Sequence, residues 1–191
     1  DKPWLIGADD GRTVSYGELR ELTGRIAHLL RERGLAANER VALLSGNSIE
    51  HLVCYLGVMA YGATICTVHV EMNRNQLDDI LVRLAPRRVL HQDGLGLDDL
   101  LAGISAPRLR LGQWNRAEPG SFYAEVAGCT ASEAVTTAEP DDDAVILFTS
   151  GTSARPKGVV LDYREHLGNI DPTAAGFGIT ADDRIYDFRS F

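Results

Sequence analysis

The sequence contains few cysteines, and their spacing is unlike that of a disulfide framework or a metal site. Only three are present in 191 residues, Cys54, Cys66 and Cys129, and no two of them form a Cys-x-x-Cys pair. An odd number of widely separated cysteines does not indicate a disulfide framework. Cys54 and Cys66 lie inside apolar runs, so we expect both to be buried thiols of a cytoplasmic protein in a reducing compartment.

Long hydrophobic runs and an excess of positive charge are also lacking. No apolar run approaches the roughly 18 residues needed to cross a bilayer, and residues 1–4 show no basic-then-apolar signal pattern. The 19 basic and 27 acidic residues give a formal net charge of −8. Because binding to nucleic-acid phosphates needs a clustered basic surface, we expect no nucleic-acid partner and no membrane span.

What is present is the composition of an ordinary globular protein. Hydrophobic residues make up 45% and charged residues 24% of the chain, which excludes a disordered or fibrous protein. The length predicts one domain, or one domain and part of another. A chain of this length buries about 70% of its unfolded surface, so it needs no disulfide or metal to fold.

Short apolar runs alternate with amphipathic segments, which is typical of βαβ units in a mainly parallel sheet. Ser15 and Glu18 have the spacing of a capping box that begins a helix ending near Gly34. Further helices are predicted at 48–61, 73–84 and 97–104, and strands at 41–44, 63–68, 88–90, 109–111, 144–148 and 159–161. We therefore predict an α/β fold with helices layered on a mainly parallel sheet, and we expect the strand at 144–148 to be fully buried.

The most informative segment connects the last two of these strands. It packs four hydroxyl side chains, two glycines and two cations into ten residues: Thr149-Ser150-Gly151-Thr152-Ser153-Ala154-Arg155-Pro156-Lys157-Gly158. Small residues let backbone N–H groups approach an anion closely, and hydroxyl groups add further donors. With Lys157 placing a positive charge against the outer phosphates, the segment is suited to hold a nucleotide tail.

Two better-known nucleotide motifs do not fit the sequence. A Walker A loop that starts at Gly151 would place its lysine at Lys157, but Pro156 replaces the second glycine and Gly158 the hydroxyl residue that holds magnesium. Gly94-Leu95-Gly96 begins like a dinucleotide fingerprint, but Asp99 stands where the third glycine belongs. Neither motif explains the segment at 149–158.

The segment resembles the phosphate-binding signature of the adenylate-forming ligases, usually Thr-Ser-Gly-Thr-Thr-Gly-x-Pro-Lys-Gly. Ser153 stands for a threonine and keeps its hydroxyl, whereas Ala154 stands for a glycine and narrows the backbone freedom of the loop. Between the loop and the later matching segment, Asp162-Tyr163-Arg164-Glu165 keeps only the arginine of the family's Thr-His-Arg-Asn. Other segments resemble the family in the right order, namely residues 13–19, 40–50, 55–63 and 177–184.

This resemblance implies the chemistry of acyl- and aryl-CoA synthetases, luciferases and nonribosomal peptide adenylation domains. In these enzymes a carboxylic acid attacks the α-phosphate of ATP with Mg2+, which gives an acyl-adenylate and diphosphate, and a thiol then takes the acyl group. The implied partners are a small carboxylic acid and either coenzyme A or the phosphopantetheine of a carrier protein. The resemblance implies six phosphate-binding residues: Thr149, Ser150, Gly151, Thr152, Ser153 and Lys157. Lys157 is the implied catalytic residue, and no residue is implied to hold a metal.

The resemblance also implies that the chain is the N-terminal portion of an AMP-binding domain. Residues 1–129 would form a βαβ-rich subdomain, 130–143 an acidic connector and 144–191 the phosphate-loop segment, without the C-terminal lid domain. We expect such a chain to be inactive by itself. Candidates to border the acyl or diphosphate region are Tyr186, Arg189 and Phe191, although a strand with its surface turn is the alternative there.

The remaining polar residues lack the spacing of a site. The five histidines, at 28, 51, 69, 91 and 166, show no ligand spacing. The acidic runs at 141–143 and 182–183 are interpreted as turns rather than cation sites.

Four functions are weighed on these grounds. An acyl- or aryl-CoA ligase comes first, because residues 70–77 resemble those enzymes more than the proline-rich form of peptide adenylation domains. A carrier-protein-loading adenylation domain comes second. The others are a phosphotransferase with an atypical loop, which would release ADP rather than AMP, and a non-catalytic nucleotide-binding module.

Overall fold

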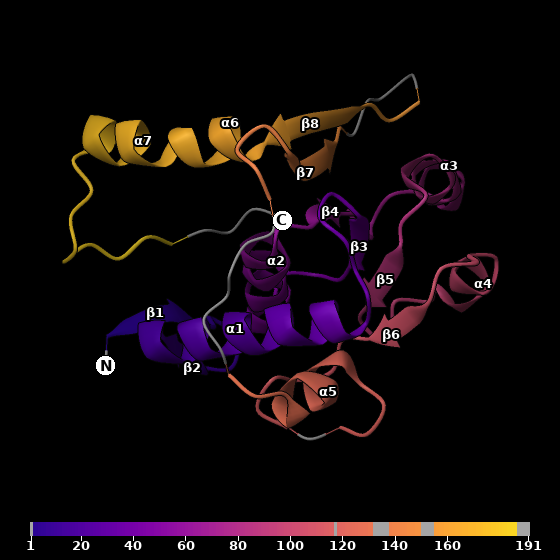
Figure 1. Cartoon of the computed structure of the whole chain (residues 1–191), viewed down its shortest axis with the longest axis horizontal. Helices are drawn as coiled ribbons and strands as arrows, with labels where there is room; N and C mark the ends of the chain where they lie inside the picture. Colours follow the sequence, from indigo (N-terminus) through magenta and orange to yellow (C-terminus); the bar gives the residue numbers. More distant parts are fainter. Residues whose placement is uncertain (1, 117, 132–137, 150–154, 187–191) are drawn as a thin grey trace.

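A computed structural model describes residues 2–116, 118–131, 138–149 and 155–186 (Figure 1). Its main sheet has the strand order β6-β5-β3-β4-β7-β8, in which all neighbours are parallel except the antiparallel pair β7–β8. A separate antiparallel pair joins β1 to β2. The strands are β1 (Pro3–Ile6), β2 (Thr13–Ser15), β3 (Arg40–Leu44), β4 (Thr64–Thr67), β5 (Arg88–His91), β6 (Arg108–Arg110), β7 (Asp143–Phe148) and β8 (Gly158–Asp162).

The helices begin and end at residues suited to those positions. Ser15 caps α1 in a capping box with Glu18, and Ser48 caps α2 by accepting from the His51 amide. Gly62 ends α2 with a φ of 99°, a left-handed conformation that glycine adopts without strain. The helices are α1 (Tyr16–Glu32), α2 (Ile49–Tyr61), α3 (Arg74–Leu84), α4 (Asp98–Ala102), α5 (Phe122–Gly128), α6 (Tyr163–Gly168) and α7 (Ile170–Phe177).

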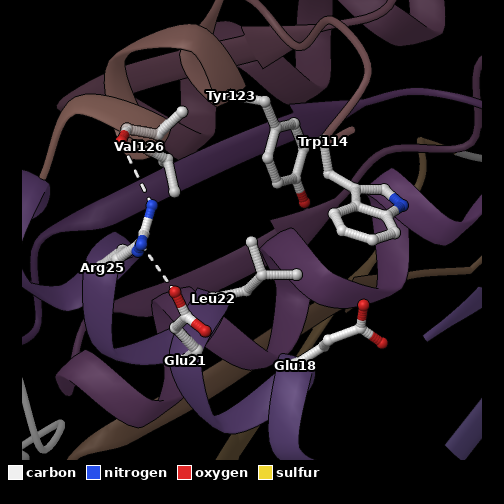
Figure 2. Close-up of a pocket in the computed structure, with 8 residues that line it drawn as sticks. Glu18, Glu21, Leu22, Arg25, Trp114, Tyr123 and Val126 are labelled. Carbon is white, nitrogen blue, oxygen red and sulfur yellow. Dashed lines mark hydrogen bonds and ion pairs between the residues drawn. The ribbon is translucent and has the colours of Figure 1, made fainter. Parts of the chain in front are cut away.

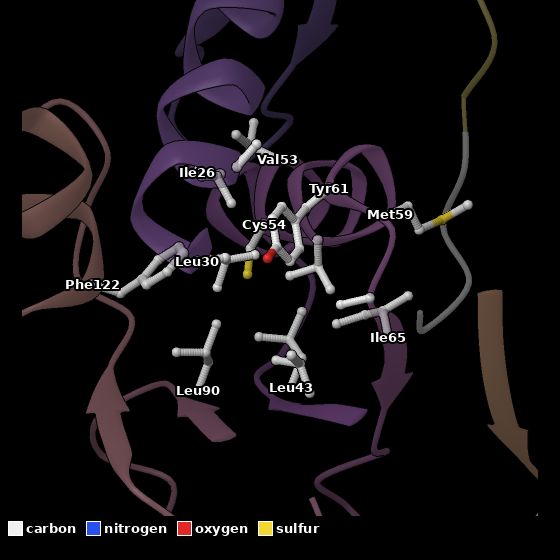
Figure 3. Packing of buried hydrophobic residues seen from close by; sticks show 14 of the residues in the cluster. Ile26, Leu30, Leu43, Val53, Cys54, Met59, Tyr61, Ile65, Leu90 and Phe122 are labelled. Carbon is white, nitrogen blue, oxygen red and sulfur yellow. The ribbon is translucent and has the colours of Figure 1, made fainter. Parts of the chain in front are cut away.

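The main sheet has a hydrophobic cluster on each face, so the molecule has three layers. Along β3, Val41 and Leu43 join the cluster formed with α1, α2 and α5, whereas Ala42 and Leu44 join the one formed with α3 and α4. Figure 3 shows Leu43 and Leu90 facing Ile26, Leu30 and Cys54 of the covering helices. Strands buried on both faces need apolar residues at successive positions, which explains the continuous apolar runs in the sequence.

The predicted α/β fold with a mainly parallel sheet is confirmed, with bounds that shift by one or two residues. The expectation that the strand at 144–148 is fully buried is wrong at its end, because Leu147 is 41% exposed. Leu147 and Val145 point to the same face of the sheet. In the described part of the chain, the hydrophobic cluster on that face includes Val145 but not Leu147. The sequence patterns missed the short elements β1, β2, α5, α6 and α7.

Candidate functional site

The segment suited to phosphate binding connects β7, an inner strand of the sheet, to the edge strand β8. Phe148 pairs with Gly158 at the last position of the ladder, and one step further the Thr149 amide donates a hydrogen bond of 2.9 Å to the Lys157 carbonyl oxygen. A weaker contact of 3.4 Å runs from the Lys157 amide to the Thr149 hydroxyl. The two ends of the segment are thus fixed side by side.

The structure brings together two of the six predicted phosphate-binding residues at this base. Thr149 and Lys157 are both exposed, and among the described residues no carboxylate forms an ion pair with the Lys157 ammonium group. An exposed hydroxyl that lies against the backbone of an exposed lysine, whose ammonium group has no carboxylate partner among the described residues, fits the oxygens of a phosphate chain. Ser150, Gly151, Thr152 and Ser153 lie outside the described residues.

Two charged side chains of helix α3 contact residues 155 and 156, which lie in the second half of this segment. Arg83 donates a hydrogen bond of 2.6 Å from Nη2 to the Pro156 carbonyl oxygen, and its guanidinium lies 5.6 Å from the centre of the Phe148 ring. Asp79 forms an ion pair of 3.4 Å with Arg155. Sequence reasoning missed these contacts, because Arg83 and Pro156 are 73 positions apart and no motif joins them.

A second group of charged residues is structural rather than reactive. Arg12 donates two hydrogen bonds, of 2.5 and 3.2 Å, to the carboxylate of Glu50, whose side chain is only 6% exposed. The hydrogen bonds to that carboxylate raise the pKa of the Arg12 guanidinium above its ordinary value. The Tyr123 hydroxyl donates to the Glu50 carbonyl oxygen over 2.7 Å. Glu50 therefore joins α2 to the segment before β2 and to α5.

A cavity of about 210 Å³ lies between α1 and α5, far from the strands β7 and β8 that carry Thr149 and Lys157 at their ends (Figures 1 and 2). Figure 2 shows Glu21 and Arg25 on one side and Tyr123 and Trp114 on the other. Arg25 is already bonded to Glu21 at 2.6 Å and to the Ala127 carbonyl oxygen at 3.1 Å. The charged groups of Glu21 and Arg25 thus bind one another, and the cavity is lined by none of the predicted site residues.

The other candidate residues do not gather into a site. Tyr186 is 75% exposed, and Arg189 and Phe191 lie outside the described residues. Cys54 and Cys66 are buried, as predicted, and burial raises the pKa of the Cys66 thiol to about 12. In the acidic runs, Asp142 accepts from the Glu139 amide and Asp183 from the Thr180 amide.

The described residues contain no group of three or more histidine, cysteine, aspartate or glutamate side chains placed to hold a metal ion. No helix in the same part of the chain has the length and apolar composition that would let it span a membrane.

Comparison with known proteins gives matches over nearly the whole chain. The family model described as "AMP-binding enzyme" matches residues 1–189. The chain is 29% identical over 187 residues to nonribosomal peptide synthetase ungA of Aspergillus violaceofuscus, with 97% of the chain covered. It is 26% identical over 218 residues to a 3-hydroxybenzoate–CoA ligase of Aromatoleum, again with 97% of the chain covered.

A solved structure shares both the fold and part of the sequence. The crystal structure of ATP-bound MatB from Rhodopseudomonas palustris matches 95% of this chain with a TM-score of 0.82 and 30% identity. The chain spans only a part of each relative: 36% of MatB, 36% of the CoA ligase and 2% of the peptide synthetase.

Proposed function

Because the chain belongs to the AMP-binding enzyme family, we propose that it carries the phosphate-binding part of an ATP-dependent acid–thiol ligase. The observation that supports this most directly is the pairing of Thr149 with Lys157 at the base of the β7–β8 connection. It joins the backbones of a threonine and a lysine near the two ends of the segment that resembles the family's phosphate-binding signature. The ATP in the related MatB structure supports ATP as the nucleotide.

In the first step, a carboxylate oxygen of the acid bonds to the α-phosphorus of ATP, and the bond to the bridging oxygen of the diphosphate breaks. The leaving diphosphate gains negative charge in this step, so a fixed positive group beside it lowers the barrier. Lys157 supplies that charge, and the Thr149 hydroxyl supplies a hydrogen-bond donor. When bound, Mg2+ would neutralise further phosphate charge.

In the second step, a thiolate sulfur attacks the carbonyl carbon of the acyl-adenylate, and AMP leaves with the electron pair of the broken C–O bond. Coenzyme A is our first candidate for this thiol, because residues 70–77 resemble acyl- and aryl-CoA ligases more than peptide adenylation domains. The phosphopantetheine of a carrier protein is the second, and the peptide synthetases among the relatives support it.

The test is acid-dependent exchange of labelled diphosphate into ATP, measured on the longest natural form of the protein with aliphatic, aromatic and amino acids. We expect exchange with one class of acid, and AMP as the nucleotide product after a thiol is added. Formation of ADP would instead indicate a phosphotransferase. ATP binding without exchange for any acid would indicate a non-catalytic nucleotide-binding module.

A further inference from the structure

One side chain of helix α3, that of Arg83, contacts residues next to both ends of the phosphate-binding segment. Arg83 on α3 contacts Phe148, which precedes Thr149, and Pro156, which precedes Lys157. Both contacts are made by one guanidinium group, which is planar and can donate in its plane while an aromatic ring lies against its face. Arg83 therefore connects Phe148, the residue before the segment, to Pro156 near the end of the segment.

The hydrogen bond from Arg83 to Pro156 fixes the orientation of one peptide unit. Pro156 has no N–H, its ring restricts φ, and the residue is buried. Its remaining backbone polar group is the carbonyl oxygen that Arg83 binds at 2.6 Å. Because this carbonyl and the Lys157 N–H belong to one rigid peptide unit, holding the carbonyl orients the start of Lys157.

Asp79, one helical turn before Arg83, holds the arginine in place. The two side chains form an ion pair of 2.8 Å between Arg83 Nη2 and Asp79 Oδ2. The other carboxylate oxygen of Asp79 pairs with Arg155 at 3.4 Å. The Arg155 side chain is 83% exposed, so this pair alone contributes little. Asp79 is 22% exposed, so its contact with Arg83 is the better shielded one.

From this geometry we propose that Arg83, held by Asp79, is a positioning residue for Lys157. Arg83 fixes the Pro156 carbonyl and the end of β7, so that the Lys157 ammonium group is set toward the phosphates before ATP arrives. A group that is already in place loses less conformational freedom when it binds. The inference rests on the proposed function in one respect, namely that Lys157 binds phosphate.

The first test measures the environment of Lys157 directly and needs no activity. The chain has only two lysines, Lys2 and Lys157, so an amine-reactive acylating reagent followed by mass spectrometry compares their labelling rates in one sample. We expect Arg83→Ala to change the rate at Lys157 about twofold or more and to leave Lys2 unchanged. An unchanged rate at Lys157 in folded Arg83→Ala would overturn the proposal.

The matched control is Arg74→Ala. Arg74 lies on the same helix and forms an ion pair of 3.3 Å with Asp78 across the same four-residue spacing, but it forms no hydrogen bond or ion pair with the described residues of the segment at 149–158. We expect it to leave both labelling rates unchanged. If Arg74→Ala changes the rate at Lys157 as much as Arg83→Ala does, the effect belongs to α3 as a whole and the proposal is wrong.

The second test uses kinetics of the longest natural form. Loss of one charge-assisted hydrogen bond is expected to raise the KM for ATP about five- to twentyfold in Arg83→Ala, with the KM for the acid unchanged. In a Lys157→Ala background the same substitution should have no further effect, because Arg83 acts through Lys157. Full additivity of the two substitutions would contradict the inference.

Two further outcomes keep the inference separate from the proposed function. Absence of exchange in the wild type refutes the proposed function, whereas the labelling experiment still decides the role of Arg83. If Arg83→Ala fails to fold, Asp79→Asn replaces it, since this change keeps the size of the side chain and removes the charge that holds Arg83. We expect Asp79→Asn to change the labelling rate at Lys157 and to leave Lys2 unchanged, and an unchanged rate at Lys157 would overturn the proposal.

Discussion

Thr149 and Lys157 face each other one step beyond the β7–β8 ladder, and the Thr149 amide donates to the Lys157 carbonyl oxygen over 2.9 Å. The backbone of Lys157 is therefore as firmly placed as a strand residue, while its side chain is exposed. A cation on a fixed backbone can stabilise a developing charge without reorganising.

Lys157→Ala is expected to slow acyl-adenylate formation more than thioester formation. In the proposed function Lys157 binds the leaving diphosphate, which is present only in the first half-reaction, so the loss there should be about 100-fold or more. Diphosphate exchange measures the first half-reaction, and transfer from supplied acyl-adenylate to the thiol measures the second. Lys2→Ala is the control, because Lys2 bonds the Ala181 carbonyl oxygen instead. Equal losses in both half-reactions would speak against this role.

Gly57→Ala is expected to destabilise the fold although alanine is the better helix former. A methyl group at Gly57 would stand 2.6 Å from Cδ1 of Ile26, where α2 packs on α1. Ile26 is fully buried, so it has no space to move, and such overpacking costs about 1–3 kcal/mol. Urea unfolding measures the change. Gly176→Ala on α7, where nothing lies within 4 Å, should be neutral or stabilising; a matching loss there would remove the packing explanation.

Arg12→Met is expected to cost about 2–4 kcal/mol of unfolding free energy, because it leaves the buried Glu50 carboxylate without its main partner. The double variant Arg12→Met/Glu50→Leu should lose less than Arg12→Met alone, since it removes the unpaired charge as well. Chemical denaturation of the wild type, both single variants and the double variant measures the coupling. Additive losses would show that the pair at 2.5 Å contributes nothing as a pair.

His51 should make the protein less stable as the pH falls from about 6.5 to about 4. Burial lowers the pKa of His51 from 6.5 to about 4, so between these values the unfolded chain binds more protons than the folded one. The unfolding free energy therefore decreases as the pH falls through this range, by about 3 kcal/mol in total. Below about pH 4 the contribution levels off.

Urea unfolding of the wild type and of His51→Gln, measured from pH 7 to pH 4, isolates this contribution from those of the carboxylates. The two curves should converge as the pH falls. His28→Gln is the control, because the His28 side chain is 33% exposed whereas His51 is buried. Parallel curves for the wild type and His51→Gln would contradict the assignment.

Much of the fold could be predicted because its causes are local. Ser15 with Glu18, Ser48 and Asn73 cap their helices through contacts three residues apart, and such spacings are visible in the chain itself. The buried strands were predictable because cover on both faces requires continuous apolar runs. Short helices such as α5 and α7 were not, because seven or eight residues carry too little periodicity.

The sequence by itself determined the α/β class, the family and the segment that holds Thr149 and Lys157, because hydrophobic period and residue order are properties of neighbouring positions. Only the tertiary structure decided what surrounds that segment. Arg83 meets Pro156 across 73 positions, and Arg12 meets Glu50 across 38, because parallel strands and their crossover helices bring distant residues together. No local pattern encodes such contacts, since they depend on the strand order of the whole sheet.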